Sequence, residues 1–447
     1  MQEDYNSESF LRRLKLYLFI FVLMIGFSHT WAVRDSVDPD GVSYLDVGNA
    51  YFNGNYSGAI NANGYWSPFY PLIQGLSNYL FNPSIDSESL FIHLVNFVIY
   101  IFSFLAFKFF FAQLMSKIDT ENKELTTLNL VTFPKWAWIT IGHFLFIWSS
   151  MNLITISKVT PDMCVSVFIY LISGLLLKIS NNKTSIIDFI FFGLFLALSY
   201  FSKAAMLLIA LIYVLVLFFM TIRQKSNLLK PLIALVVFLL VSAPYISELS
   251  KAKGHFTFSE TGKLVYSFRM EDTYFCWMGG LKGCNGVLHP AKKIFDKPNT
   301  YEFGSPIIGS YPIWFDPTYW YGGLSANFNL IKQLKILVKS FERGLDLFIE
   351  MQGFLIASFS ILLIYSSLKF KDICKLWFLI VPSFFTIFMY SLIDLQNRYL
   401  GAFICILWIS LFYSIKLKNT DESKKLLNSV SVVLILFFMI NSIKICH

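Results

Sequence analysis

The stretch AAMLLIALIYVLVLFFMTI, residues 204–222, has no charged side chain, and Lys203 and Arg223 flank it on either side. A helix of about 20 residues crosses the roughly 30 Å hydrocarbon core of a bilayer, so this run predicts a membrane-spanning helix. An open strand is excluded, because its backbone N–H and C=O groups would face lipid without hydrogen-bond partners.

Comparable apolar runs recur along the whole chain of 447 residues. Hydrophobic residues make up 56% of the sequence and charged residues only 14%, against about 25% charged in a typical soluble domain. The runs do not alternate apolar and polar residues as the strands of outer-membrane barrels do. We therefore predict an all-α integral membrane protein. Its helices, about eleven in number, are expected near residues 14–33, 89–112, 136–152, 162–180, 186–202, 204–222, 231–249, 346–368, 376–392, 399–415 and 426–443.

Short basic loops predict the orientation of these helices. With the N-terminus in the cytoplasm, every short basic loop falls on the cytoplasmic face, as the positive-inside rule requires. These loops contain Lys117, Lys123, Lys135, Lys178, Lys183, Arg223, Lys225, Lys230, Lys369, Lys371, Lys375, Lys416, Lys418, Lys424 and Lys425. The same rule accounts for the net charge of +8, and nothing in the sequence resembles a nucleic-acid-binding module. We predict a bacterial inner-membrane protein.

The start of the chain allows two interpretations. Arg12, Arg13 and Lys15 precede the first apolar run, as in a cleaved signal peptide. No clean small-x-small cleavage site follows, and many further apolar runs come after it, so we expect a retained signal-anchor helix. The chain then divides into an N-terminal transmembrane module, residues 1–249, an extracytoplasmic region, 250–345, and C-terminal transmembrane helices, 346–447.

The first extracytoplasmic loop, residues 34–88, carries an unusual concentration of polar groups. Its segment DGVSYLDVGNAYFNG predicts a short helix over residues 42–52, which is closed by Asn53 and Gly54. Trp and Tyr in the following YWSPFYPL favour the membrane interface, and its prolines break regular structure. The loop thus predicts a juxtamembrane helix beside a carboxylate-bearing segment.

This loop resembles the corresponding part of the GT-C membrane glycosyltransferases, which include the protein O-mannosyltransferases and the aminoarabinose transferase of lipid A. The resemblance extends to an acidic residue in a later short loop, TPDM, a large loop before the late helices, and RYL near the end. It departs in lacking the adjacent Asp-Glu pair of the mannosyltransferases. It implies transfer of a sugar, with inversion, from a polyprenyl-phosphate donor to an extracytoplasmic glycan, lipid or protein acceptor.

Carboxylates are the expected catalytic groups, because a hydroxyl acceptor needs a base to take its proton as it attacks the anomeric carbon. The resemblance favours Asp40 as that base and Asp162 as a second acid that orients substrate or cations. Two alternatives stay open for Asp40: it caps the following helix, or Asp38 takes its place. Asp162 can equally be a helix-N-terminal acid that interacts with the helix dipole. Asp46 lies inside the predicted helix, and the alternative to a site role is a position on a solvated face.

Cations at the ends of predicted spans are candidates for binding the lipid phosphate. Arg398 is favoured, because a planar guanidinium grips phosphate bidentately, and Lys158, Lys203 and Arg34 are further candidates. The alternative is that each only extends its charged tip to the membrane interface. Candidate substrate-binding aromatics are Tyr44, Trp66, Tyr70 and Tyr399.

Two further features are left open by the sequence. Cys276 and Cys284 flank a Gly-rich turn on the predicted extracytoplasmic face, where a disulfide is plausible and two reduced thiols are the alternative. A divalent cation could bridge Asp40 and Asp162, but no sequence signal demands one, so no metal ligand is assigned.

A rival hypothesis is a transporter or a flippase for lipid-linked sugars. Such proteins place ionisable residues in the middle of their spans. Here the acids and bases lie at the predicted span ends, which favours chemistry at the membrane surface. A non-catalytic polytopic scaffold is the third alternative.

Overall fold

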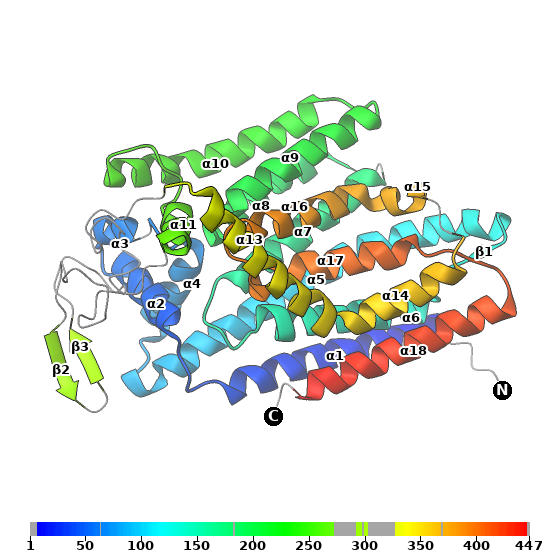
Figure 1. The fold of residues 1–447 in the computed structure, drawn as a ribbon, viewed down its shortest axis with the longest axis horizontal. Helices are drawn as coiled ribbons and strands as arrows, with labels where there is room; N and C mark the ends of the chain where they lie inside the picture. Colours follow the sequence, from blue (N-terminus) through cyan, green and yellow to red (C-terminus); the bar gives the residue numbers. More distant parts are fainter. Residues whose placement is uncertain are drawn as a thin grey trace.

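The computed structural model describes residues 7–62, 64–181, 184–271, 292–296, 299–302, 327–367 and 370–444, and nearly all of the regular structure is helical. The long helices form a bundle in which segments distant in sequence lie side by side (Figure 1). They are α1 (Glu8–Ala32), α5 (Ile85–Thr127), α6 (Lys135–Trp148), α7 (Asp162–Ser180), α8 (Ile186–Ser202), α9 (Met206–Arg223), α10 (Leu229–Lys253), α13 (Leu330–Leu345), α14 (Gly353–Tyr365), α16 (Trp377–Ser391), α17 (Asn397–Ser414) and α18 (Asp421–Lys444).

Shorter elements connect and cap the bundle. They are α2 (Pro39–Phe52), α3 (Tyr56–Ala62), α4 (Phe69–Phe81), the π-helix η1 (Ser149–Ile154), α11 (Thr261–Glu271), the π-helix η4 (Asp346–Glu350), α15 (Phe370–Ile373) and the 3-10 turn η5 (Cys374–Leu376). Strand β1 (Leu130–Val131) pairs antiparallel with β4 (Leu417–Lys418), and β2 (Lys292–Asp296) pairs antiparallel with β3 (Asn299–Glu302).

Each of the apolar runs identified in the sequence contains or overlaps a helix, which confirms the all-α membrane fold. Among the described residues, seven helices are long and apolar enough to cross a membrane, or eight if the bent pair formed by residues 330–350 and α14 is one span. The two parts of that pair meet at 67°. Gln352 lies fully buried at the bend and accepts a hydrogen bond of 2.6 Å from Trp408 Nε1.

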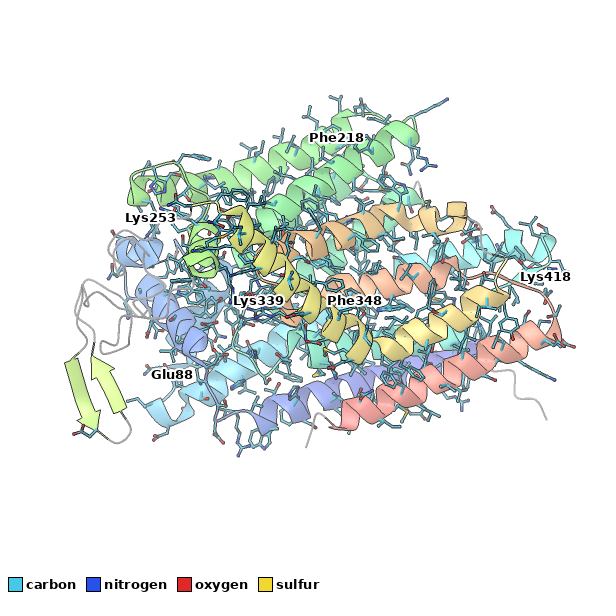
Figure 2. All side chains as sticks on the ribbon, in the orientation of Figure 1. Glu88, Phe218, Lys253, Lys339, Phe348 and Lys418 are labelled. Atoms are coloured by element: carbon cyan, nitrogen blue, oxygen red, sulfur yellow. The ribbon has the colours of Figure 1, made fainter. Side chains whose placement is uncertain are left out.

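Close helix contacts hold the interior together. Helix α5 packs along α7, α8 packs along α10, and α1 and α18 both lie against α6. At the contacts of α5 with α6 and α7 and of α8 with α10, a glycine lets the two helices approach, as is common in membrane bundles. A Cβ added to Gly193 would lie 2.2 Å from the carbonyl oxygen of Ala234, and Gly142 and Gly174 face phenylalanine rings of α5. Side chains fill the space between the helices (Figure 2).

The first loop folds into three short helices at one end of the bundle (Figure 1). Helix α2 begins at Pro39, three residues earlier than the sequence predicted, and ends at Phe52 as expected, followed by Asn53 and by Gly54 at φ +78°. Helix α4 was not foreseen, because Pro68 and Pro71 indicated broken structure. Both prolines lie at its first turn, where a missing N–H does not interrupt the helix.

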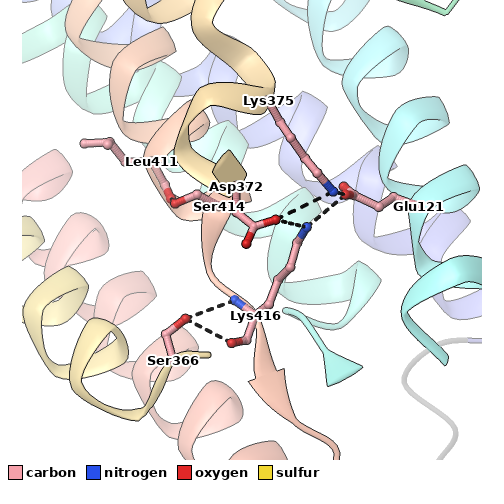
Figure 3. Close-up of polar contacts among 7 residues, drawn as sticks. All are labelled: Glu121, Ser366, Asp372, Lys375, Leu411, Ser414 and Lys416. Carbon is pink, nitrogen blue, oxygen red and sulfur yellow. Dashed lines mark hydrogen bonds and ion pairs between the residues drawn. The ribbon is translucent and has the colours of Figure 1, made fainter. Parts of the chain in front are cut away.

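The opposite end of the bundle is joined by a buried ion network (Figure 3). Glu121 of α5 pairs with Lys375 and with Lys416, whose Nζ also lies 3.1 Å from Asp372. Lys416 is only 3% exposed, and Ser366 donates a hydrogen bond of 2.9 Å to its carbonyl oxygen. The network ties α5 to the segments before α16 and after α17.

Candidate active site

A cavity of about 240 Å³ lies where the first loop meets the ends of α7, α8, α9, α11, α16 and α17. The cavity contains charged groups from segments far apart in the sequence. Its lining consists of Asp40, Tyr44, Tyr65, Trp66, Ser67, Pro161, Asp162, Ser202, Lys203, Ala204, Ala205, Leu208, Phe258, Ser259, Thr261, Gly262, Val265, Met389, Tyr390, Ile393, Asp394, Arg398 and Tyr399. Four charged residues predicted from the sequence therefore meet at one place, namely Asp40, Asp162, Lys203 and Arg398.

The start of α2 places Asp40 in this cavity. Asp38 is the residue that caps the helix, because its carboxylate accepts a hydrogen bond of 2.8 Å from the Gly41 backbone N–H. The alternative in which Asp40 caps the helix is therefore wrong. Asp38, the suggested substitute for Asp40 as the base, uses its carboxylate for the capping hydrogen bond. Asp40 lies in the first turn with its side chain 30% exposed into the cavity.

The surroundings of Asp40 raise the pKa of its carboxyl group above the ordinary value. Burial is the largest cause, and the nearby Asp38 and Asp162 carboxylates act in the same direction. Arg398 and Lys158 oppose them by favouring the charged form. A carboxyl group of this kind is more basic than an exposed aspartate, which suits proton abstraction near neutral pH.

Asp162 is the most deeply buried carboxylate of the cavity, with its side chain 3% exposed. It begins α7, where the positive end of the helix dipole favours an anion. Lys203 Nζ donates a hydrogen bond of 2.6 Å to one carboxylate oxygen, and the Thr160 hydroxyl donates one of 3.0 Å to the other. Asp162 thus both interacts with the dipole of α7, which was the alternative left open by the sequence, and forms an ion pair with Lys203.

Lys203 links α8 to α9 and is held on two sides. Besides its bond to Asp162, its ammonium lies 3.3 Å from the centre of the Tyr399 ring. Burial lowers the pKa of Lys203 to about 8, and the repulsion from Arg398 adds to this, while Asp162 acts in the opposite direction. The side chain is 20% exposed, so it can still reach a ligand in the cavity.

Arg398 stands between the two acids at the start of α17. Its guanidinium nitrogens lie 3.9 Å from Asp40 Oδ2 and 3.7 Å from Asp162 Oδ2. Its Nε donates a hydrogen bond of 3.0 Å to Gln396 Oε1, which orients the planar group. Because neither carboxylate contact is short, the guanidinium has donors left for an anionic ligand.

Asp394 forms a second charged cluster at the rim of the cavity. Its Oδ1 accepts hydrogen bonds of 2.8 Å from Arg269 of α11 and 2.7 Å from Arg343 of α13, and Gln396 donates one of 2.6 Å to Oδ2. The sequence gave no sign of its two arginine partners, because they are 125 and 51 residues away along the chain.

Aromatic side chains form one wall. Trp66 lies between Tyr44 and Tyr65, with ring centres 4.5 Å apart in both pairs. Tyr44 also meets Tyr70 edge-on at 5.1 Å. Burial raises the pKa values of Tyr44 and Tyr65 well above the ordinary value, so both phenols stay protonated and can donate hydrogen bonds.

Three predicted site residues lie outside the cavity. Tyr70 is fully buried behind the wall and donates a hydrogen bond of 2.6 Å to Asn96. Lys158 is exposed and influences Asp40 only through its charge. Arg34 stacks 4.7 Å above the Trp31 ring and pairs with Asp35 at 3.4 Å.

The donor set does not fit a divalent cation. Among the described residues, no group of three or more His, Cys, Asp or Glu side chains could hold a metal ion. Asp40 and Asp162, the pair expected to bridge one, both face the guanidinium of Arg398.

The predicted Cys276–Cys284 pair lies outside the described residues. Cys164, Cys374 and Cys405 are free thiols, and Cys164 and Cys405 are buried.

Comparison with solved structures shows a similarity of overall structure. No protein-family model matches the chain, and no curated protein matches it by sequence. The crystal structure of ArnT from Cupriavidus metallidurans in the apo state is similar at a TM-score of 0.47 and 12% sequence identity. The match covers 89% of this chain and 59% of that chain, so this protein spans about three fifths of the length of that ArnT.

Proposed function

We propose that this protein is a membrane glycosyltransferase of the GT-C type, which transfers a sugar from a polyprenyl-phosphate donor to an acceptor in the cell envelope. The observation that carries the proposal is the convergence of one basic carboxylate, Asp40, with two cations, Lys203 and Arg398, in one cavity at the ends of membrane helices. A base and an anion-binding pair are the two parts that this reaction needs.

In the proposed reaction the acceptor hydroxyl attacks the anomeric carbon of the donor sugar. The carboxylate of Asp40 takes the hydroxyl proton as the new C–O bond forms. The bond between the anomeric carbon and the phosphate oxygen breaks, and its electron pair leaves with polyprenyl phosphate. Attack from the side opposite to the phosphate inverts the anomeric centre.

Lys203 and Arg398 are the groups proposed to bind the leaving phosphate. Preorganised cations stabilise the charge that grows on the leaving oxygen, and they cost little reorganisation because protein contacts already orient them. Asp162 keeps both cations in place through contacts of 2.6 Å and 3.7 Å. We assign it a positioning role.

The aromatic wall is proposed to receive the sugar. Tyr44, Trp66 and Tyr399 line the cavity. Phenol and indole groups combine apolar surface with a hydrogen-bond donor, which suits a sugar ring. Tyr65, which the sequence did not single out, belongs to the same wall.

The test is replacement of the proposed base. Asp40→Asn keeps the shape of the side chain and removes its basicity, so we expect release of polyprenyl phosphate from a labelled lipid-linked sugar to fall by about 100-fold or more. The purified protein is assayed in a membrane extract, which supplies donor and acceptor. The amount of each protein is measured in parallel.

Asp46→Asn is the matched control. Asp46 lies in the same helix, its pKa is also raised by burial, to about 6, and it does not line the cavity. We expect near-normal activity in this variant. Normal activity in Asp40→Asn would remove Asp40 from the mechanism and with it the proposed reaction.

The transporter or flippase alternative makes a different prediction. A flippase would move the labelled lipid across a vesicle membrane without cleaving the bond between sugar and phosphate. Release of free polyprenyl phosphate by wild-type protein would contradict it, whereas translocation of intact donor without release would contradict the enzyme.

A further inference from the structure

Two adjoining cavities lie at the end of the bundle opposite to Asp40. Their volumes are about 500 Å³ and about 550 Å³, and Lys117, Ser180 and Lys375 line both. Helices α7 and α9 separate them from the candidate active site, since each helix starts beside that site and ends here. Helix α7 has 19 residues and α9 has 18, so each is about 27 Å long.

The larger of these cavities is lined by cations and has no carboxylate in its wall. Lys117, Arg223 and Lys375 supply the positive charge, and Ser180 and Gln224 supply neutral polar groups. Within the described part of the chain, Arg223 has no ion pair, and its side chain is exposed. Positive charge at this point therefore exceeds what the protein itself neutralises.

The neighbouring cavity contains two acids, Glu121 and Glu124, and Glu121 is already paired. Glu121 binds Lys375 and, at 2.9 Å, Lys416. Lys117 donates hydrogen bonds of 3.3 Å to two neutral acceptors, Ser180 and Asn181, and the charge of Glu121 also acts on it. Lys117 and Arg223 thus remain available for an anion.

The surroundings of the cationic cavity are apolar. Met220, Trp377 and Phe378 complete its wall. On α9, Phe219 and Ile222 flank Met220 and are 60% and 56% exposed, which suits contact with acyl chains. An anion bound here would therefore lie between apolar side chains on one side and the polar ends of helices on the other.

We propose that this cavity binds the phosphate head group of an anionic phospholipid of the cytoplasmic leaflet. Basic pockets between membrane helices recognise such head groups by charge, and the adjoining helix surface receives the acyl chains. A soluble phosphate shares the charge but gains nothing from Phe219 and Ile222. The site is separate from the proposed donor site and does not depend on the proposed enzyme activity.

The experiment uses the purified full-length protein in mild detergent. Native mass spectrometry measures retention of phosphatidylglycerol, of phosphatidylcholine with the same acyl chains, and of inorganic phosphate. The test variant is Lys117→Gln/Arg223→Gln, which removes two charges but keeps polar side chains. Lys225→Gln is the matched control, since Lys225 is exposed two residues beyond Arg223 and lines neither cavity.

Wild type and Lys225→Gln should both prefer phosphatidylglycerol over phosphatidylcholine. In the double variant the preference for phosphatidylglycerol over phosphatidylcholine should fall by about 30-fold, as expected for the loss of two cations near an anionic head group. If the double variant is poorly folded, the exposed single change Arg223→Gln serves instead, and Arg223→Lys should restore most of the binding. Equal preference in wild type and variant would overturn the proposal, and so would retention of inorganic phosphate as strong as that of the lipid.

Discussion

At the scale of single residues, the candidate site pairs two groups whose pKa values are shifted toward each other. Burial raises the pKa of Asp40 and lowers that of Lys203 to about 8. The base must be ionised and the phosphate-binding cation must be protonated for the proposed reaction. Both conditions hold between the two pKa values, which defines a pH window for activity.

The pH dependence of kcat/KM should therefore be bell-shaped. The rate rises with pH as Asp40 loses its proton, and it falls above about pH 8 as Lys203 loses its own. Lys203→Arg should move the alkaline limb to higher pH, because arginine stays protonated there. Initial rates of polyprenyl-phosphate release across pH 5 to 10 check this, and an alkaline limb unchanged in Lys203→Arg would contradict it.

The buried pair of Asp162 and Lys203 should also matter for stability. Lys203→Met leaves a carboxylate that is 3% exposed without its close cation, so that the Thr160 hydrogen bond and the longer contact to Arg398 remain. Loss of one partner of a buried pair costs about 3 kcal/mol of unfolding free energy.

The double variant Lys203→Met/Asp162→Asn removes the uncompensated charge and should regain most of that loss. Thermal unfolding in detergent, followed by circular dichroism, measures all three proteins. Equal destabilisation in the single and double variants would show that the charge is not the cause.

At the scale of elements, the position of α2 decides which carboxylate faces the cavity. Asp38 caps the helix and Asp40 follows in the first turn. The helix is held by close contact with α4, where Gly48 faces Gly75 and the carbonyl oxygen of Pro71. Small residues at this crossing let the two backbones approach and so fix the distance of Asp40 from Arg398.

Gly48→Ala tests this contact. Its new Cβ would lie 2.3 Å from Pro71 O and 2.7 Å from Gly75 N, so the helices must separate. We expect a loss of about 1–3 kcal/mol in stability together with reduced activity. Gly353→Ala is the control, because a Cβ at Gly353 meets nothing within 4 Å and should leave both properties unchanged.

At the scale of the whole molecule, different charged groups gather at the two ends of the bundle. The end that carries α2 and α11 holds the cavity with Asp40, and the other end holds the Glu121 network (Figures 1 and 3). We propose that residues 34–88 and 250–345 face the extracytoplasmic side and that the Glu121 network lies in the cytoplasm. The distribution of basic loops supports this orientation.

Cysteine labelling of intact cells measures this orientation. Val42, 43% exposed on α2, and Leu128, 65% exposed at the other end, are each replaced by Cys in a background where the native cysteines are Ser. A membrane-impermeant maleimide should label Val42→Cys in intact cells and Leu128→Cys only after lysis. The reverse pattern would place Asp40 in the cytoplasm and remove the proposed donor-binding site.

Much of this architecture is already determined by the amino-acid sequence. Long uncharged runs have only one stable form in a bilayer, so the helices could be located without a structure. Lys203 and Arg398 could be proposed as site residues because each stands at a span end on the same predicted face. Asp40 and Asp162 were proposed because their loops resemble those of a known enzyme family. The helix α2 was likewise visible from its periodicity and from Asn53-Gly54.

Only the tertiary structure decided which of these groups meet. Helix ends that share a face of the membrane can lie far apart, and sequence pattern does not specify lateral packing. Packing brings Arg398 between Asp40 and Asp162, adds Tyr65 and Asp394 with its two arginines, and leaves Arg34 and Lys158 outside the cavity. The physical reason is that hydropathy determines depth in the bilayer, whereas contacts between side chains of different helices determine neighbours.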